Sequence, residues 1–299
     1  MHKPPKLIWT PDGSLRPSRP VGHGILDSVD LKWAASSVGR AQRSQRWGRG
    51  FESHAVHQPL LPDVSSGMNQ LTPRQQLDLL EKMRADWDSR ARENAWHYVE
   101  NSCDQWTSEE FFATGERALA EDILTDPGNI YQGREPSAMR VLEIGCGAGR
   151  VTRALARHFG EVHGVDVSGE MVQRASAALA AFPNARVYQN NGCDLSVIPA
   201  GQFDFAYSTV VFQHIPSREI IENYVREVCR LLRPGALFKF QVQGFTGIDP
   251  VSPTDTWNGV AFSAEEAAAM ADRCGFEMRY SYGAGEQYFW LWFFKRQTP

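Results

Sequence analysis

The sequence lacks the features that mark several common classes of protein. None of its apolar runs approaches the roughly 18 residues that span a bilayer, and its N-terminus does not resemble a signal peptide. Its 5 cysteines are scattered without a CxxC pair, which disfavours both a disulfide framework and a thiolate zinc site. No His, Asp or Glu residues have the spacing of metal ligands. We therefore expect a cytoplasmic protein with no membrane segment and no bound metal.

The composition is that of a folded protein. Hydrophobic residues make up 42% of the 299 residues and charged residues 22%, which is too apolar for a disordered chain. A chain of this length can bury a substantial core, as one large domain or two small ones. The formal net charge of -4 is unevenly distributed along the chain.

Residues 1–67 differ from the rest of the sequence. They contain 7 prolines, show no sustained helical or strand periodicity, and carry 9 Lys and Arg against 5 Asp and Glu. Such a segment is a disordered extension without a role, or a basic arm that contacts nucleic acid or an acidic surface. We expect the folded domain to cover residues 68–299.

A third interpretation is that residues 1–67 are not native. The runs Ser36–Ala41 (SSVGRA) and Gly50–Ser53 (GFES) can be reverse-translated as AGC-TCA-GTT-GGT-AGA-GC and GG-TTC-GAA-TCC. These strings resemble the D-arm and T-arm of a transfer-RNA gene, in the right order. We therefore hypothesise that a tRNA gene was read as protein from an upstream start, and that the native chain begins at Met68. Native peptides that map before Met68 by mass spectrometry would contradict this hypothesis.

Two helices are expected before the first strand, in a helical lid over residues 68–135. The first begins at Thr72 and Pro73, an N-cap hydroxyl followed by proline, and continues as an apolar stripe to Tyr98. The second begins at Thr107, which forms a capping box with Glu110, and runs towards Leu124.

From Met139 onward, short apolar runs alternate with helical patterns, which predicts an α/β fold with a parallel sheet and helices on both faces. Strands are expected at residues 140–144, 162–167, 185–189, 203–208 and 237–242, and helices at 150–158, 169–181 and 218–232. Ser263 and Glu266 begin a further helix that ends at Gly275. The last two strands, at 277–282 and 287–294, are joined by a glycine-rich turn and form an antiparallel hairpin. The sheet core of residues 139–299 therefore has seven strands in a Rossmann-like arrangement.

A glycine loop follows the first strand of this sheet. The segment Val141–Arg150 (VLEIGCGAGR) reads as a strand, a glycine turn and the N-terminus of a helix, which together form a nucleotide-cofactor site at the carboxyl edge of a sheet. The next strand ends in Asp166, placed to accept hydrogen bonds from ribose hydroxyls. A dinucleotide fingerprint would need a third glycine where Arg150 stands.

The spacing GxGxG with Glu143 two residues before it resembles the class I S-adenosylmethionine-dependent methyltransferases. The resemblance covers Glu143–Gln243 closely and Met68–Arg296 in architecture, and it implies S-adenosylmethionine as the cofactor. It implies that Gly145, Cys146, Gly147 and Gly149 form the loop along the methionine and ribose part. It further implies the roles of four more positions: a loop-orienting or amino-group contact at Glu143, a ribose contact at Asp166, and adenine packing at Val167 and Met171.

The adenine contact is less defined, because the family's acidic residue after the third strand falls on Gly192 here. We predict that Asn191 and the backbone of Gly192 and Cys193 take this place, with Asp194 as the alternative.

The methyl acceptor is expected beside Thr209–His214, after the fourth strand, with Thr209 itself predicted to contact the cofactor. This segment lacks the Asn/Asp-Pro-Pro-aromatic run of enzymes that methylate nucleic-acid bases. Residues 68–299 retain 22 of the 31 basic and 30 of the 35 acidic residues, a net charge of -8 that disfavours nucleic acid as a partner. We therefore expect a small-molecule acceptor.

His214 is the candidate general base at this edge, and packing at the start of the next helix is its alternative role. The expected roof of the acceptor pocket is aromatic and comprises Trp87, Arg90, Trp96, Tyr98 and the loop Gly244–Val260 with Trp257. Two other functions stay open, a nicotinamide-dependent oxidoreductase and a non-catalytic protein that binds S-adenosylmethionine. Nothing in the sequence selects the acceptor atom or the oligomeric state.

Overall fold

The computed structural model describes residues 7–9, 15–17, 72–199, 201–245 and 256–297. The chain divides into two compact units, Met1–His57 and Gln58–Pro299. In the first unit, β1 (Leu7–Trp9) pairs antiparallel with β2 (Leu15–Pro17), two short strands that the sequence periodicity did not predict. The tRNA-like runs and Met68 lie outside the described residues, so the predictions about them stay predictions.

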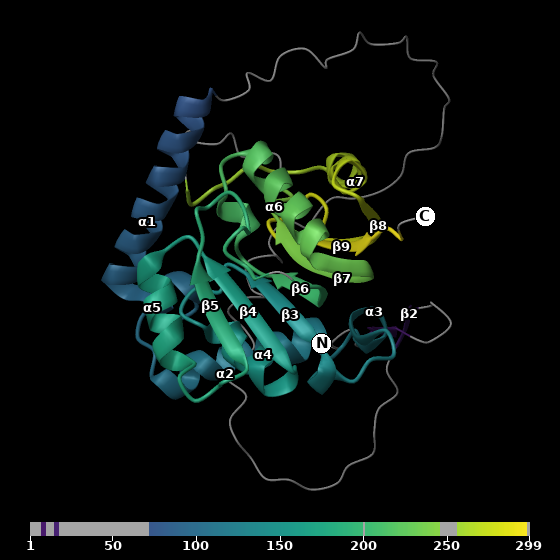
Figure 1. Cartoon of the computed structure of the whole chain (residues 1–299), viewed down its shortest axis with the longest axis horizontal. Helices are drawn as coiled ribbons and strands as arrows, with labels where there is room; N and C mark the ends of the chain where they lie inside the picture. Colours follow the sequence, from purple (N-terminus) through teal and green to yellow (C-terminus); the bar gives the residue numbers. More distant parts are fainter. Residues whose placement is uncertain (1–6, 10–14, 18–71, 200, 246–255, 298–299) are drawn as a thin grey trace, which may run out of the picture. The chain divides into compact units, whose positions relative to one another are not determined.

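The second unit contains a seven-stranded sheet with the order β5-β4-β3-β6-β7-β9-β8 (Figure 1). Neighbouring strands are parallel from β5 to β7, whereas β9 runs antiparallel to both β7 and β8. This confirms the predicted mostly parallel sheet with a C-terminal antiparallel hairpin. The strands are β3 (Arg140–Ile144), β4 (Glu161–Asp166), β5 (Ala185–Gln189), β6 (Phe203–Ser208), β7 (Leu232–Val242), β8 (Phe276–Tyr282) and β9 (Phe289–Lys295).

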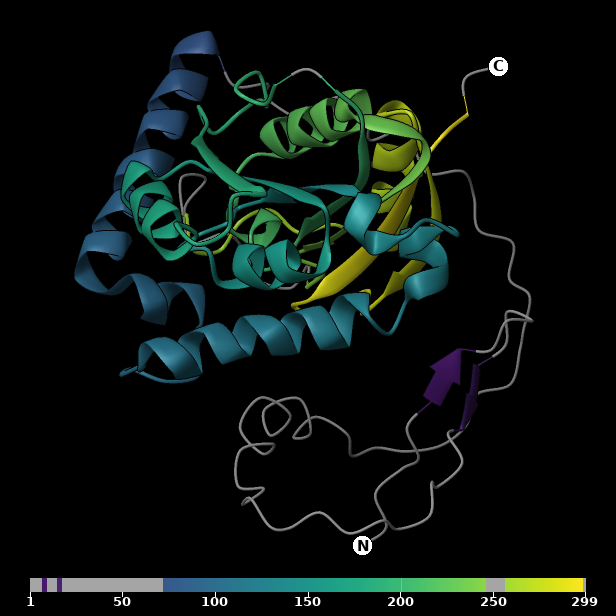
Figure 2. The same ribbon diagram turned by 60° about the horizontal axis from the view of Figure 1, so that its bottom comes forward.

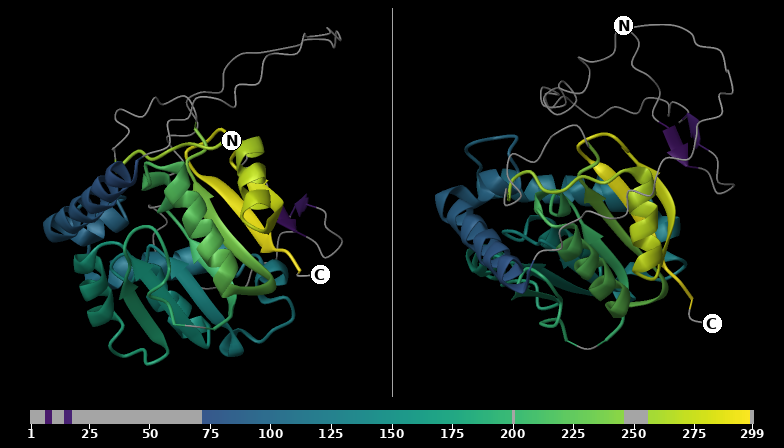
Figure 3. Two further views of the ribbon diagram at one scale, coloured as in Figure 1. Left: turned by 45° about the horizontal axis from the view of Figure 1, so that its top comes forward. Right: turned by 90° about the horizontal axis from the view of Figure 1, so that it is seen from above.

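Helices cover both faces of the sheet because successive strand residues point to opposite sides. On one face lie α6 (Arg218–Leu231) and α7 (Ala264–Arg273) (Figure 3). Their buried side chains share a hydrophobic cluster with Leu142 and Phe238 of the sheet. On the other face, α4 (Arg150–His158) packs on the adjacent alternating positions, among them Val141 and Leu237. α5 (Gly169–Ala178) follows β4 in the sequence.

The N-terminal helices begin at the predicted capping residues. α1 (Pro73–Val99) starts after Thr72 and bends at Asn94, whose φ of -162° and ψ of 85° are not helical. α2 (Ser108–Ala118) starts after Thr107 and continues into a π-helix at Leu119–Ile123, which α3 (Pro127–Tyr131) follows. α1 contacts α5, and the views of Figures 1 and 2 agree that the two helices lie side by side. None of the helices in the described ranges is both long and apolar enough to cross a membrane.

Buried polar contacts connect the segment after α2 to the sheet. The Tyr207 hydroxyl donates to Asp122 Oδ2 at 2.6 Å, and Trp292 Nε1 donates to Asp126 Oδ2 at 2.8 Å. The buried Lys239 ammonium donates to the main-chain oxygen of Asp122 and lies 4.7 Å from the centre of the Trp292 ring. Burial raises the pKa of the partly buried Asp122, and the hydrogen bond from Tyr207 and the charge of Lys239 offset part of this increase.

α2 and α4 approach each other closely at Gly115. A Cβ atom added at Gly115 would lie 2.0 Å from the main-chain oxygen of Arg150. The neighbouring Thr114 oxygen accepts a hydrogen bond from Arg150 Nη1 at 3.3 Å. The absence of a side chain at Gly115 therefore sets the distance between the two helices.

We predict that Gly115→Ala destabilises the protein although alanine favours helices. The added methyl group forces α2 away from α4, and overpacking of this kind lowers the free energy of unfolding by about 1–3 kcal/mol. Gly128→Ala in α3 is the control, because a Cβ there meets nothing within 4 Å and should be neutral or stabilising. Urea denaturation of both variants measures the difference, and equal stabilities would contradict this account of the packing.

Candidate functional site

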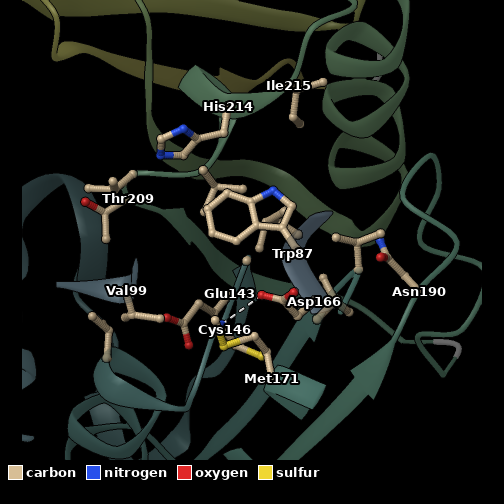
Figure 4. A pocket seen from close by; sticks show the side chains of 18 of the residues that line it. Trp87, Val99, Glu143, Cys146, Asp166, Met171, Asn190, Thr209, His214 and Ile215 are labelled. Atoms are coloured by element: carbon tan, nitrogen blue, oxygen red, sulfur yellow. Dashed lines mark hydrogen bonds between the residues drawn. The ribbon is translucent and has the colours of Figure 1, made fainter. Parts of the chain in front are cut away.

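The main pocket lies at the carboxyl ends of the central parallel strands, where α/β sheets bind their ligands (Figure 4). It encloses about 860 Å³ of space between atoms, including its opening to solvent. Its floor is the glycine loop after β3, and its other walls come from the ends of β4, β5 and β6 and from α1.

The glycine loop has a backbone that residues with side chains rarely adopt. Gly145, Gly147 and Gly149 have φ angles of 74°, 51° and 83°. A Cβ atom at Gly145 would lie 2.2 Å from Val211 Cγ2. Glycine is therefore required at this position both by conformation and by space.

Asp166 is fixed by the main chain on both of its oxygens. Oδ2 accepts a hydrogen bond from the Gly147 N–H at 2.9 Å (Figure 4), and Oδ1 accepts one from the Ser168 N–H at 2.9 Å. Burial raises the pKa of Asp166 to about 6, although these two hydrogen bonds favour the ionised form. The carboxylate thus joins the glycine loop to the start of α5.

Glu143 carries a buried oxygen without a hydrogen-bond partner. The residue is 3% exposed, and its Oε2 has no partner among the described residues. Burial raises the pKa of Glu143 to about 7, an increase that the nearby Thr152 and Arg150 side chains reduce. Because buried polar groups are normally satisfied, this oxygen is suited to a polar or cationic ligand group.

The structure brings most of the predicted site residues together. Those that line the main pocket are Glu143, Gly145, Cys146, Gly147, Asp166, Val167, Met171, Thr209 and His214. Gly149 does not line it, and its role in the structure is to cap α4 in a left-handed conformation.

The residues after β5 that were predicted to contact adenine do not line the pocket; these are Asn191, Gly192, Cys193 and the alternative Asp194. The Asn191 side chain closes a turn, because its Oδ1 accepts hydrogen bonds from the N–H groups of Cys193 and Asp194 at 2.9 Å. Their role as ligand contacts stays a prediction.

Two polar residues that the sequence did not single out line the pocket at this end. The Asn190 amide Nδ2 donates to the hydroxyl of Tyr224, on α6, at 2.7 Å. Asn190 comes directly after β5, the position where site residues gather in such sheets, so a strand-end rule could have found it. Tyr224 has no comparable signal.

His214 lies at the opposite end of the pocket, in a short 3₁₀ turn at Phe212–His214. Its Nδ1–H donates to the main-chain oxygen of Trp257 at 2.6 Å, which places the lone pair of the neutral ring on Nε2. The imidazole packs against both Trp87 and Trp257, with ring centres at 5.3 and 5.0 Å, and the two indole rings also contact each other at 6.4 Å.

The predicted aromatic roof is formed in part. Trp87 and Tyr98 line the pocket, and the Arg90 guanidinium lies 4.7 Å from the centre of the Trp87 ring. Trp96 points elsewhere and stacks on Phe111 at 5.1 Å. Of the loop 244–260, residues 246–255 lie outside the described part of the chain.

Val210 has a strained backbone at the pocket wall. Its φ of 57° is unusual for a β-branched residue, and its N–H donates to the buried Gln241 Oε1 at 2.8 Å. The Thr209 hydroxyl donates to the same oxygen at 3.3 Å. Gln241 therefore holds the turn that places Thr209 and Val211 in the pocket.

No group of three or more His, Cys, Asp or Glu side chains within the described ranges is arranged to hold a metal ion. The pocket thus offers carboxylates, a glycine loop and an aromatic end as its chemical elements.

Comparison with known proteins gives matches that include several methyltransferases. A family model described as a methyltransferase domain matches residues 141–235. The 2-methyl-6-phytyl-1,4-hydroquinone methyltransferase of Synechocystis sp. is 26% identical over 159 residues, covering 46% of this chain and 49% of that protein. The ubiquinone biosynthesis O-methyltransferase of Xanthomonas axonopodis pv. citri is 30% identical over 102 residues, covering 34% and 41%. The matches thus span half or less of the length of these relatives.

Solved structures match over more of the chain. The complex of DhpI with SAH has a TM-score of 0.52 at 18% identity, and covers 74% of this chain and 98% of that chain. Magnesium protoporphyrin IX methyltransferase (ChlM) from Synechocystis PCC 6803, with bound SAM, has a TM-score of 0.52 at 16% identity, covering 73% and 97%. At these identities the likeness shows the fold alone.

Proposed function

We propose that this chain, which contains a class I methyltransferase domain, transfers a methyl group from S-adenosylmethionine to a small-molecule acceptor. The observation that carries the proposal is the buried Glu143 oxygen without a partner, which shares the pocket with Asp166 and the glycine loop. Two carboxyl groups in one pocket, that of Glu143 buried and that of Asp166 partly buried, suit a ligand that carries positive charge.

The donor set of the pocket fits S-adenosylmethionine, a molecule with an ammonium group, a sulfonium centre and ribose hydroxyls. The cofactor would supply an activated methyl group. Glu143 would accept a hydrogen bond from the ammonium group, directly or through water, and Asp166 from the ribose hydroxyls. The loop of Gly145, Cys146 and Gly147 would follow the methionine and ribose part.

The adenine would pack on Val167 and Met171, which line the same pocket. Its polar contacts are proposed for Asn191, Gly192 and Cys193, with Asp194 as the alternative. Asn190, the residue that lines the pocket directly before them, is added to these candidates.

The acceptor is proposed to bind at the aromatic end of the pocket. Trp87, Tyr98 and Val211 give this end apolar walls, which suit a largely apolar or planar molecule. The relatives named above methylate a hydroquinone and act in ubiquinone biosynthesis, which agrees with such an acceptor. The net charge of -8 over residues 68–299 gives no support for nucleic acid as a substrate.

His214 is the proposed general base for an acceptor that must lose a proton, because its Nε2 bears the lone pair of the neutral ring. Packing against the two tryptophans is its alternative role. Comparison of the pH–rate profiles of wild type and His214→Gln separates these roles, since only a base imposes its ionisation on the rate.

The other functions considered from the sequence have less support. The matching family model is a methyltransferase domain and not a nicotinamide-dependent oxidoreductase, and Arg150 replaces the third glycine of a dinucleotide site. A non-catalytic protein that binds S-adenosylmethionine would use the same pocket but form no S-adenosylhomocysteine. A cytoplasmic location stays a prediction.

The proposal predicts cofactor binding that depends on Asp166. Asp166→Ala removes the ribose contact and should weaken S-adenosylhomocysteine binding by about 10- to 100-fold, roughly 1.5–3 kcal/mol. Isothermal titration calorimetry measures the dissociation constant. Asp78→Ala, an exposed carboxylate paired with Arg74, is the control and should bind like wild type. Wild type that binds NAD⁺ but neither S-adenosyl compound would contradict the proposed function.

The raised pKa values of Glu143 and Asp166 lead us to expect that S-adenosylmethionine binds more tightly as the pH rises. Without ligand, the pKa values of Asp166 and Glu143 are about 6 and about 7, so both groups are largely protonated at pH 5. A cationic ligand favours the ionised forms of these two carboxyl groups, so the groups release protons when the ligand binds. We expect about tenfold or more tighter binding at pH 8 than at pH 5, as each pKa unit corresponds to about 1.4 kcal/mol.

Calorimetry in buffers of different ionisation enthalpy counts the released protons. S-adenosylhomocysteine, whose sulfur is neutral, is the control ligand and should show a weaker pH dependence. A stronger dependence for the neutral ligand would contradict the assignment of the two carboxylates.

A further inference from the structure

One turn of α1 contacts the structures at both ends of the pocket. Asp88 contacts the start of α5, next to Asp166. Asp86 accepts a hydrogen bond from the Thr256 hydroxyl at 2.6 Å, next to the Trp257 carbonyl that holds His214. Trp87, between them, lines the pocket (Figure 4). The two carboxylates therefore contact different ends of the pocket, Asp88 the end near Asp166 and Asp86 the end near His214.

Asp88 is the acceptor for the buried N-cap residue of α5. Its Oδ1 accepts hydrogen bonds from the Ser168 hydroxyl at 2.6 Å and from the Glu170 N–H at 3.3 Å. The Ser168 side chain is fully buried, and its hydroxyl oxygen accepts the Met171 N–H at 3.1 Å. With both its donor and its acceptor capacity used, Ser168 is held in one position.

Ser168 transmits this constraint to Asp166. The Ser168 N–H donates to Asp166 Oδ1 at 2.9 Å, while Gly147 holds the other oxygen of the same carboxylate. A continuous chain of hydrogen bonds thus runs from Asp88 through Ser168 to Asp166. Loss of the Asp88 oxygen would leave the buried Ser168 hydroxyl without its acceptor, and the turn between Asp166 and α5 would lose a restraint.

We propose that Asp88 is a positioning residue of the cofactor site, which sets the orientation of the Asp166 carboxylate through Ser168. This inference rests on the proposed function, in which Asp166 holds the ribose. According to this proposal, α1, which lies outside the glycine-loop motif, contributes to cofactor affinity through Asp88. The orientation matters because two ribose hydroxyls need correctly directed acceptor lone pairs.

Asp88 could also affect cofactor affinity merely by holding α1 against the rest of the domain. Other contacts of α1 allow this effect to be tested separately. Arg92 on α1 pairs with Glu170 on α5 at 3.2 Å, an ion pair that holds the two helices without touching Ser168. Asp86 holds α1 to Thr256 with the same kind of hydroxyl hydrogen bond at the same length as Asp88. Arg92→Ala and Asp86→Ala therefore loosen the helix while leaving the chain to Asp166 intact.

The test measures S-adenosylhomocysteine affinity by calorimetry in the full-length protein, with thermal stability of each variant recorded without ligand. We expect Asp88→Ala to weaken binding by about tenfold or more. Asp88→Asn should bind more like wild type, because its amide oxygen still accepts the Ser168 hydroxyl. Asp86→Ala and Arg92→Ala should stay within about threefold of wild type.

A second readout separates positioning from general stability. The negative charge of Asp88 contributes to the raised pKa of Asp166. The Asp88→Asn variant removes this charge and leaves Glu143, the other carboxyl group of the pocket with a raised pKa, in place. In Asp88→Asn, the pH at which S-adenosylhomocysteine binding is half-maximal should therefore shift to lower pH. This readout also applies if Asp88→Ala fails to fold.

The outcomes are distinguishable. If wild type binds neither S-adenosyl compound, the proposed function is wrong and the role of Asp88 falls with it. If wild type binds but Asp88→Ala binds equally well, or Asp86→Ala loses as much affinity, only the positioning role is overturned. An unshifted pH midpoint in Asp88→Asn would also overturn it.

Discussion

The Asp166 carboxylate is the point on which the rest of the site depends. Its two oxygens are held by N–H groups of the glycine loop and of the turn into α5, so one side chain joins the segments that follow β3 and β4. Burial disfavours its ionised form and raises its pKa to about 6. The site is therefore built to be completed by a ligand with hydroxyl donors and positive charge, which also accounts for the unpaired oxygen of Glu143.

Around this point, the fold brings together segments that are far apart in the sequence. α1 lies across the pocket, contacts α5 through Asp88 and contacts the Trp257 segment through Asp86. The Trp257 carbonyl in turn fixes the tautomer of His214, at the acceptor end. The cofactor and acceptor ends of the pocket thus share one helix, and the chemistry proposed for each depends on the position of that helix.

Much of this could be predicted from the sequence because the signals are local. The strands β3, β5 and β6 and the helix α4 have the predicted bounds, since short apolar runs and a glycine turn fix them. Tertiary contacts decided the rest. The left-handed backbone of Val210 depends on Gln241, a residue 31 positions away, and Tyr224 reaches the pocket only because α6 packs beside β5's end. The position of β9 between β7 and β8 likewise depends on pairing between distant strands, which the local sequence pattern does not predict.

The central claim is that this pocket delivers a methyl group from S-adenosylmethionine to a small molecule. Incubation of the protein with methyl-labelled S-adenosylmethionine and a small-metabolite extract, followed by mass spectrometry, tests it most directly. The account predicts a labelled product together with S-adenosylhomocysteine, and both should form more slowly when Asp166→Ala replaces wild type at a cofactor concentration too low to saturate the variant. Cofactor binding without S-adenosylhomocysteine formation in any extract would contradict the claim and identify a binding protein instead of an enzyme.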